Sequence, residues 1–265
     1  MHAYVTPPVI DPELLMLAYR GGVFPMADSR DDPEVFWVEP RQRAILPLDG
    51  FHLSHSLACT LRRGRFDVTC NAAFSEVIAA CAVRREESEG SWISHRIQAS
   101  YEALHALGHA HSIECWERSD DGTQTLVGGL YGVAFDGAFC GESMFSIRTD
   151  ASKVALAWLV AAMRKGGAQL LDCQFITSHL ASLGAVEISQ KRYLTLLREA
   201  QSGASAAAGS SGVGLADGVA EGDGLGRGAV LALPDAFAAL LDDAASSGLS
   251  SSPGKLIAHF LTHTS

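Results

Sequence analysis

The stretch GGLYGVAFDGAFCGESMFSIRTDASKVALAWLVAAMRKGGAQLLDCQFITSHLASLGA, residues 128–185, contains the pattern that decides the fold. Small and apolar residues on both sides of Asp136 and Gly137 predict two strands joined by a tight turn, because this pair tolerates the positive φ of such turns. Apolar residues then recur at steps of three and four, which predicts a helix over 152–164 that ends at Gly166.

A short apolar run at 168–175 follows the helix and has the length of a buried strand. Asp172 and Gln174 are two residues apart in this run, so a regular strand would place both side chains on the same face. Two polar side chains on a core strand need partners, since an unpaired buried carboxylate is costly. The pair therefore either belongs to a buried hydrogen-bond network or lines a cleft.

Glu142, near the end of the preceding strand, is the natural third member of this group. With Phe145 and Phe175 beside them, the three polar residues would form an acidic cleft with aromatic flanks. Such a cleft suits a cationic amine.

The rest of the chain predicts alternating helices and strands. We expect helices from Pro12, over 72–83 and over 91–108, a strand over 43–48, and a loop over 23–40 that contains Pro and Asp. This order indicates a mixed α and β fold.

Several long blocks resemble the leucyl/phenylalanyl-tRNA-protein transferases, and they occur in the family's order. Within 128–188 these blocks are GGLYGVAFDGAFCGESMFS, ASKVAL and LLDCQFITSHLASLGAVEI. The earlier blocks are LLMLAYRGGVFPM, FWVEPRQRAILPLDGFHLS, FSEVIAAC, GSWIS and LHALGHAHSIECW. The resemblance covers nearly all of residues 10–200.

The resemblance implies an α+β fold in two parts. A small N-terminal domain would occupy residues 1–42, and an acetyltransferase-like (GNAT-like) mixed sheet flanked by helices would occupy 43–200. Residues 201–265 begin with a tract rich in Gly, Ala and Ser, typical of a flexible linker. We expect a flexible C-terminal extension there, with two short helices near its end and no catalytic part.

The resemblance also implies an activity. An enzyme of this kind moves Leu or Phe, and Met less well, from aminoacyl-tRNA to the N-terminal amine of proteins that begin with Arg or Lys, marking them for N-end-rule degradation. By resemblance, Asp172 orients Gln174, Gln174 hydrogen-bonds the attacking amine, and Glu142 holds the positive end of the acceptor. Neither a cofactor nor a metal is implied.

The transferred side chain needs an apolar pocket, for which Leu130, Phe139 and Phe145 are candidates. Ser143, next to the glutamate, is a further candidate for the substrate site. Trp37 is another, because the region around it helps to form the cleft in the resembled family.

The net charge of −10 and the pI of about 5.4 argue against a generally basic nucleic-acid-binding surface. A contact with tRNA must therefore be a local patch. The best candidates are Arg62, Arg63 and Arg65 near the end of a predicted helix, followed by Arg84 and Arg85. The alternative is that basic residues in the last turn only stabilise the helix dipole.

Two other functions are compatible with this fold. An acyl-CoA-dependent acetyltransferase would need backbone amides at a helix N-terminus to hold a pyrophosphate, and the corresponding segment SIRTDASK, 146–153, contains no glycine. A non-catalytic peptide-binding module would use the acidic cleft without an acyl donor.

The remaining motifs point to a soluble, cytoplasmic protein that we expect to be a monomer. His105 and His109 have a zinc-like spacing, but Gly108 interrupts the helix between them, so packing near the mouth of the next strand is favoured over a metal. The six cysteines have no close pairing, and there is no apolar run long enough for a membrane span.

Overall fold

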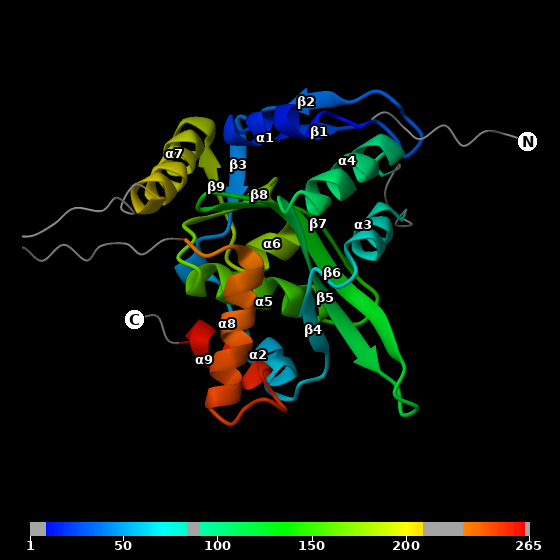
Figure 1. The fold of residues 1–265 in the computed structure, drawn as a ribbon, viewed down its shortest axis with the longest axis vertical. Coiled ribbons are helices and arrows are strands. Elements are labelled where there is room, and N and C mark those ends of the chain that lie inside the picture. Colours follow the sequence, from blue (N-terminus) through cyan, green and yellow to red (C-terminus); the bar gives the residue numbers. More distant parts are fainter. Residues whose placement is uncertain (1–8, 84–90, 209–229, 263–265) are drawn as a thin grey trace, which may run out of the picture.

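The computed structural model describes residues 9–83, 91–208 and 230–262. Its centre is a seven-stranded sheet with the order β4-β5-β6-β7-β8-β3-β9, in which β7 and β8 are parallel and the other neighbours are antiparallel (Figure 1). The strands are β3 (Gln42–Ile45), β4 (Asp67–Cys70), β5 (Ala110–Arg118), β6 (Gln124–Phe135), β7 (Ala138–Ser146), β8 (Leu170–Gln174) and β9 (Val186–Ser189).

Helices cover both faces of this sheet. Consecutive residues of β6, Leu130 and Tyr131, belong to two different hydrophobic clusters, so the clusters lie on opposite faces. The cluster with Leu130 includes residues of α2 (His55–Arg62), α5 (Ala151–Lys165), α8 (Leu233–Ser246) and α9 (Gly254–Thr262). The cluster with Tyr131 includes residues of α1 (Pro12–Arg20), α3 (Phe74–Ala82), α4 (His95–Ala106) and α7 (Gln190–Ala208). The expected α+β class, with a mixed sheet flanked by helices, is confirmed.

The predicted hairpin and the helix after it are present. Asp136 takes a φ of 52° at the turn between β6 and β7. Helix α5 is buried along most of its length because it lies between the sheet and α8. The short elements η1 (Leu48–Gly50) and α6 (Ser178–Ser182) connect the larger ones.

The N-terminal region begins with α1, whose first turn is capped by the Asp11 carboxylate. The expected loop over 23–40 is in part wrong, because β1 (Phe24–Met26) and β2 (Phe36–Val38) pair there as a small antiparallel sheet. Strands of three residues are too short to show an alternating pattern, and Pro25 made a strand still harder to predict.

The described part of the C-terminal extension is folded onto the core, which corrects the expectation of a flexible tail for residues 230–262. Helix α7 runs on to Ala208 through an Ala-rich segment that favours helix. The Phe237 ring of α8 contacts Trp158 of α5, with centroids 5.0 Å apart. Any side chain at Gly254 would stand 2.2 Å from the Leu61 carbonyl oxygen, so α9 meets the end of α2 at close range.

Within the described ranges, every helix is too short or too polar to cross a lipid bilayer.

Candidate functional site

A cavity opens where β7 and β8 separate. The two strands pair only as far as Cys140 and Asp172. Residues 141–144 of β7 and 173–175 after that point form part of the wall of a cavity of about 840 Å³. A cavity of this size is large enough for a small ligand or for the end of a larger one.

A β-bulge places Glu142 at this opening. Tyr131 of β6 is opposite Ser143 and Gly132 is opposite Gly141, so Glu142 is an extra residue in β7. Bulges re-aim side chains and are common beside functional sites. The bulge accounts for a carboxylate that lines the cavity from the middle of a core sheet.

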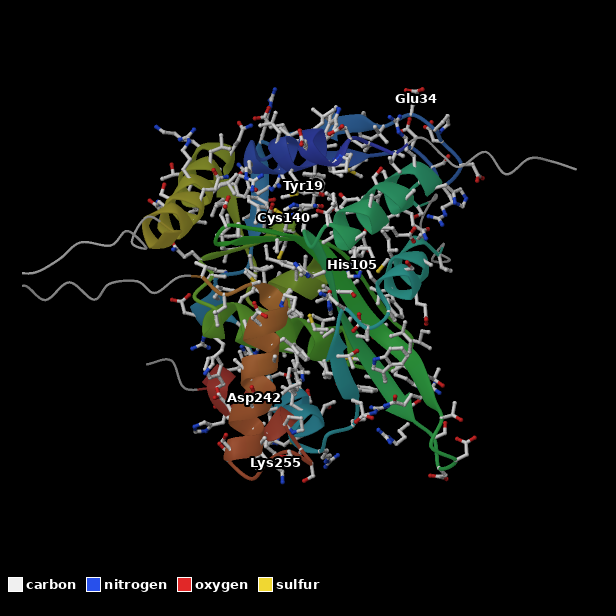
Figure 2. All side chains as sticks on the ribbon, viewed as in Figure 1. Tyr19, Glu34, His105, Cys140, Asp242 and Lys255 are labelled. Carbon is white, nitrogen blue, oxygen red and sulfur yellow. The ribbon has the colours of Figure 1, made fainter. Side chains whose placement is uncertain are left out.

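Three donors surround the Glu142 carboxylate. The Tyr19 hydroxyl donates to Oε1 at 2.7 Å, and the Tyr101 hydroxyl donates to Oε2 at 3.0 Å. The Gln174 amide donates through Nε2 to Oε1 at 2.8 Å. The two tyrosine hydroxyl oxygens also lie next to each other. Figure 2 labels Tyr19 on the side of α1 that faces the sheet.

Burial raises the pKa of Glu142 to about 7, although the hydrogen bonds from Tyr19, Gln174 and Tyr101 act in the opposite direction. The nearby charge of Asp172 raises this pKa further. Burial likewise raises the pKa values of Tyr19 and Tyr101 well above 10, so both remain neutral donors. The site therefore holds a carboxylate that titrates near neutral pH.

Asp172 lies behind the cavity wall and does not line it. The Arg43 guanidinium donates from Nε to Oδ1 at 2.9 Å and from Nη2 to Oδ2. The Tyr193 hydroxyl donates to Oδ2 at 2.9 Å, and the carboxylate is fully buried. The expected cleft with both polar side chains of the strand on its wall is thus only half right: Gln174 lines it and Asp172 is sealed by Arg43.

Two aromatic rings contact the Arg43 guanidinium. Its guanidinium carbon lies 4.8 Å from the Phe24 ring centroid and 4.4 Å from that of Tyr193. Burial alone would lower the pKa of Arg43, but the facing Asp172 carboxylate raises it overall. Among the residues that the structure describes, Glu142 is therefore the carboxylate that lines the cavity.

Asp172 acts on Gln174 through the backbone. The Gln174 N–H donates to Asp172 Oδ1 at 2.8 Å, and Gln174 has a φ of 62°. A positive φ is uncommon for a residue other than glycine, and residues with this backbone conformation are often found at functional sites. This turn of the backbone directs the Gln174 side chain toward Glu142, on the other side of the strand gap.

Some of the candidate substrate-binding residues line the cavity and others do not. Leu130 and Ser143 line the cavity, whereas Phe139, Phe145 and Trp37 do not. Phe139 packs in the core below α5, and Phe145 is 6% exposed in the opposite cluster. Trp37 lies on β2 and is 40% exposed. Phe175, expected beside the polar residues, also lines the cavity. The other large apolar residues of the lining are Val83, Trp92, Leu130, Met144, Leu156, Leu159, Leu171 and Leu180.

The arginine candidates lie at the end of α2. Arg62, Arg63 and Arg65 are exposed, and none of them forms an ion pair with a residue that the structure describes. Arg84 and Arg85 lie outside the described residues.

The histidines are engaged in packing. His105 stacks on Phe74 with centroids 4.3 Å apart, and His111 Nδ1 is 3.0 Å from the Asn71 amide. In the part of the chain that the structure describes, no three His, Cys, Asp or Glu side chains are grouped as metal ligands.

Sequence reasoning missed Arg43, Tyr19, Tyr101 and Tyr193. The tyrosines lie on helices whose apolar periodicity explains them as core residues. Arg43 offered one signal, since it is a charged residue at the start of an apolar strand. Its partner could not be read, because Asp172 lies 129 residues away.

Comparison with known proteins decides the family. The model of the leucyl/phenylalanyl-tRNA protein transferases matches residues 45–198, and the model of their N-terminal domain matches residues 9–41. The chain belongs to this family. The resemblance seen in the sequence, and with it the expectation of an aminoacyltransferase, is confirmed at the level of the family.

Proteins named leucyl/phenylalanyl-tRNA–protein transferase from several bacteria are similar over most of their length. That of Novosphingobium aromaticivorans is 62% identical over 98% of this chain and 99% of its own. That of Rhizorhabdus wittichii is 58% identical over 76% of this chain and 80% of its own. Among solved structures, L-PGS from Bacillus licheniformis is 14% identical over 64% of this chain and 55% of its own, with a TM-score of 0.33, too low to establish a shared fold.

The two transferase family models together include every residue of the Glu142 and Asp172 networks except Arg43. Tyr19 and Phe24 fall in the N-terminal model, and the other members fall between 45 and 198 except Arg43, which lies in the short gap between the models. Helices α8 and α9 lie beyond both models, although the Novosphingobium protein aligns over nearly the whole chain.

Proposed function

We propose that this protein transfers Leu or Phe, and Met less well, from aminoacyl-tRNA to the α-amine of proteins that begin with Arg or Lys, and so marks them for N-end-rule degradation. Family membership supports the reaction class. The observation that carries the proposal is the Gln174 amide held by Glu142 on the wall of a cavity with an apolar side.

The reaction is aminolysis of an ester. The acceptor nitrogen bonds to the carbonyl carbon, the bond from that carbon to the tRNA oxygen breaks, and the oxygen leaves with a proton. Because the ester is already activated, the enzyme mainly aligns two reactants, which can be worth roughly 7 to 11 kcal/mol. An α-amine, with a pKa of about 7.7 to 8.0, is more often neutral at pH 7 than a lysine side chain near 10.4.

The Gln174 amide is oriented for this task. Its Nε2 donates to Glu142, so the acceptor Oε1 is the end left for the N–H of an incoming amine. A neutral amide is too weak a base to deprotonate an ammonium, so Gln174 positions the amine and proton removal falls to water or a tRNA hydroxyl. Glu142 supplies negative charge for the cationic acceptor.

Asp172 has a supporting role in this proposal. Its carboxylate fixes the Gln174 backbone and is neutralised by Arg43, so it orients without adding charge to the cavity. The leucine-rich part of the wall receives the side chain of the transferred residue, with Leu130 as a member and Ser143 at its polar border. The exposed Arg62, Arg63 and Arg65 contact tRNA phosphates.

The first turn of α5 does not favour a binding site for acyl-CoA. A side chain at Gly128 of β6 would stand 2.4 Å from the Ala151 Cβ, so the strand packs directly on this turn. The Ser152 N–H donates a hydrogen bond to Ser146 Oγ at 3.3 Å. The acidic residue Asp150 occupies the N-cap position of α5. An amide already bonded and a carboxylate at the cap do not suit a pyrophosphate.

A transfer assay tests the proposal. Purified protein is mixed with tRNA that carries radiolabelled leucine or phenylalanine and with a peptide that begins with Arg, and acid-stable label on the peptide is counted. We expect label on Arg- and Lys-initiated peptides and none on a matched peptide that begins with Ala. Label from acetyl-CoA instead of aminoacyl-tRNA, or peptide binding without transfer, would contradict the proposal.

A further inference from the structure

The Tyr131 hydroxyl differs from the other described tyrosine hydroxyls. Those of Tyr19 and Tyr101 donate to Glu142, and that of Tyr193 donates to Asp172. The Tyr131 oxygen is buried and has no hydrogen-bond partner among the residues that the structure describes. A desolvated hydroxyl without a partner costs free energy, so such groups call for an explanation.

Tyr131 also lines the cavity beside the Glu142 bulge. Edge contacts hold its ring, with centroids 5.9 Å from Phe74 and 5.5 Å from Tyr101. Its backbone is paired on both sides, with Ser112 on β5 and with Ser143 on β7. The ring, and with it the hydroxyl, is therefore held in one place beside the cavity.

The phenol keeps its proton at working pH. Burial, then the Glu142 charge, raises the pKa of Tyr131 well above 10. A neutral phenol can donate to a carbonyl oxygen and can exchange hydrogen bonds with a hydroxyl. It is a poor partner for an ammonium when a carboxylate with a donor network, Glu142, stands in the same cavity.

We infer that Tyr131 binds the aminoacyl donor, its hydroxyl bonding either the ester carbonyl oxygen or the neighbouring ribose hydroxyl; the inference rests on the proposed function. Glu142 and Gln174 account for the amine, and the leucine side of the wall accounts for the transferred side chain. The polar atoms left at the reacting end are the ester carbonyl and the neighbouring ribose hydroxyl. Tyr131 lines this cavity, and its buried hydroxyl has no hydrogen-bond partner among the described residues.

The test compares wild type with Tyr131→Phe, which removes only the oxygen. We expect kcat/KM for Leu-tRNA to fall about five- to tenfold, with the KM for the Arg-initiated peptide unchanged. The Tm should stay the same or rise, because the variant deletes a buried hydroxyl that has no described partner. A lowered Tm, a wild-type rate, or an effect confined to the peptide KM would overturn the inference.

A second aminoacyl-tRNA substrate shows whether Tyr131 binds the ribose hydroxyl or the ester carbonyl oxygen. With tRNA that ends in 2′-deoxyadenosine, Tyr131→Phe should change transfer less than twofold if the hydroxyl binds the ribose hydroxyl. The same fall on both donors would assign the ester carbonyl.

Ser112→Ala serves as the control. It removes a buried hydroxyl directly opposite Tyr131 that donates to Glu114 and does not line the cavity, so transfer should be unchanged. An inactive wild-type protein would contradict the proposed function, whereas an active wild type that is matched by Tyr131→Phe would contradict this inference alone.

Discussion

Gln174 donates a hydrogen bond to Glu142 at 2.8 Å although the two residues lie on strands that no longer pair at that point. The side chains bridge the gap that the backbones leave open. A β-bulge on one strand and a positive φ on the other bring them together. Both irregularities serve the same contact, which is the reason to regard it as the centre of the site.

Gln174→Ala should lower the transfer rate at least tenfold, because in the proposed mechanism this amide orients the attacking amine. Wild-type Gln174 already has a positive φ, so alanine adds no new backbone strain and the Tm should change little. Gln169→Ala, an exposed glutamine just before the same strand, is the matched control. Steady-state transfer to an Arg-initiated peptide gives the comparison; equal rates for both variants would remove Gln174 from the mechanism.

Asp172→Ala should destabilise the fold as well as reduce transfer. The variant leaves the Arg43 guanidinium buried without its carboxylate, which costs about 3 to 5 kcal/mol. The loss of stability follows from the buried ion pair and could not be expected from the strand pattern alone. Urea denaturation of Asp172→Ala, Arg43→Ala and the double variant measures the coupling. Strictly additive losses would mean that the pair contributes nothing as a pair.

Glu142→Gln should remove a pH dependence near neutrality. The pKa of Glu142 is raised from 4.5 to about 7, so the folded state binds more protons than the unfolded state between these pH values. Stability from this group is therefore present below about pH 4.5 and is lost as pH rises through about 7, by on the order of 3 kcal/mol. Transfer should show the opposite trend, since in the proposed mechanism the carboxylate form of Glu142 holds the cationic acceptor.

Denaturation and transfer at pH 5, 6, 7 and 8 give both curves. Relative to Glu142→Gln, the wild type should lose stability and gain activity over this range. Parallel curves for the two proteins would show that Glu142 does not titrate there. The acceptor amine titrates in both proteins, so its contribution cancels in the ratio.

Phe237→Ala should cost about 3 to 5 kcal/mol of folding stability, because a buried ring of α8 leaves a cavity against Trp158. Leu241→Ala, on the same helix but 38% exposed, should cost less than about 1 kcal/mol. Urea titration gives both values. The transfer rate per folded molecule should stay unchanged in both, as expected for an extension without a catalytic part.

Replacing Arg62, Arg63 and Arg65 with alanine should weaken tRNA binding at the exposed end of α2. If each arginine neutralises one phosphate, the slope of log affinity against log salt should fall by roughly 2 to 3. Arg198→Ala on α7, which lies far from α2 in Figure 1, is the control. Titration of Leu-tRNA at several salt concentrations measures the slope. An unchanged slope would leave these arginines with only a helix-dipole role.

The sequence by itself determined the local elements and the family. Spacing of apolar residues located the hairpin and α5, and the run around Asp172 and Gln174 identified β8 as the strand with polar members. These features depend on neighbours in the chain, because helices and strands have fixed repeats of 3.6 and 2 residues.

Only the tertiary structure decided which polar groups meet. Tyr19 and Glu142 are 123 residues apart, and Arg43 and Asp172 are 129 apart. Their pairing depends on a bulge, a strand gap and a sheet order that no local pattern records. The fold for this reason gives different surroundings to two carboxylates that look alike in sequence: Asp172 pairs with Arg43 in the core, and Glu142 lines the cavity.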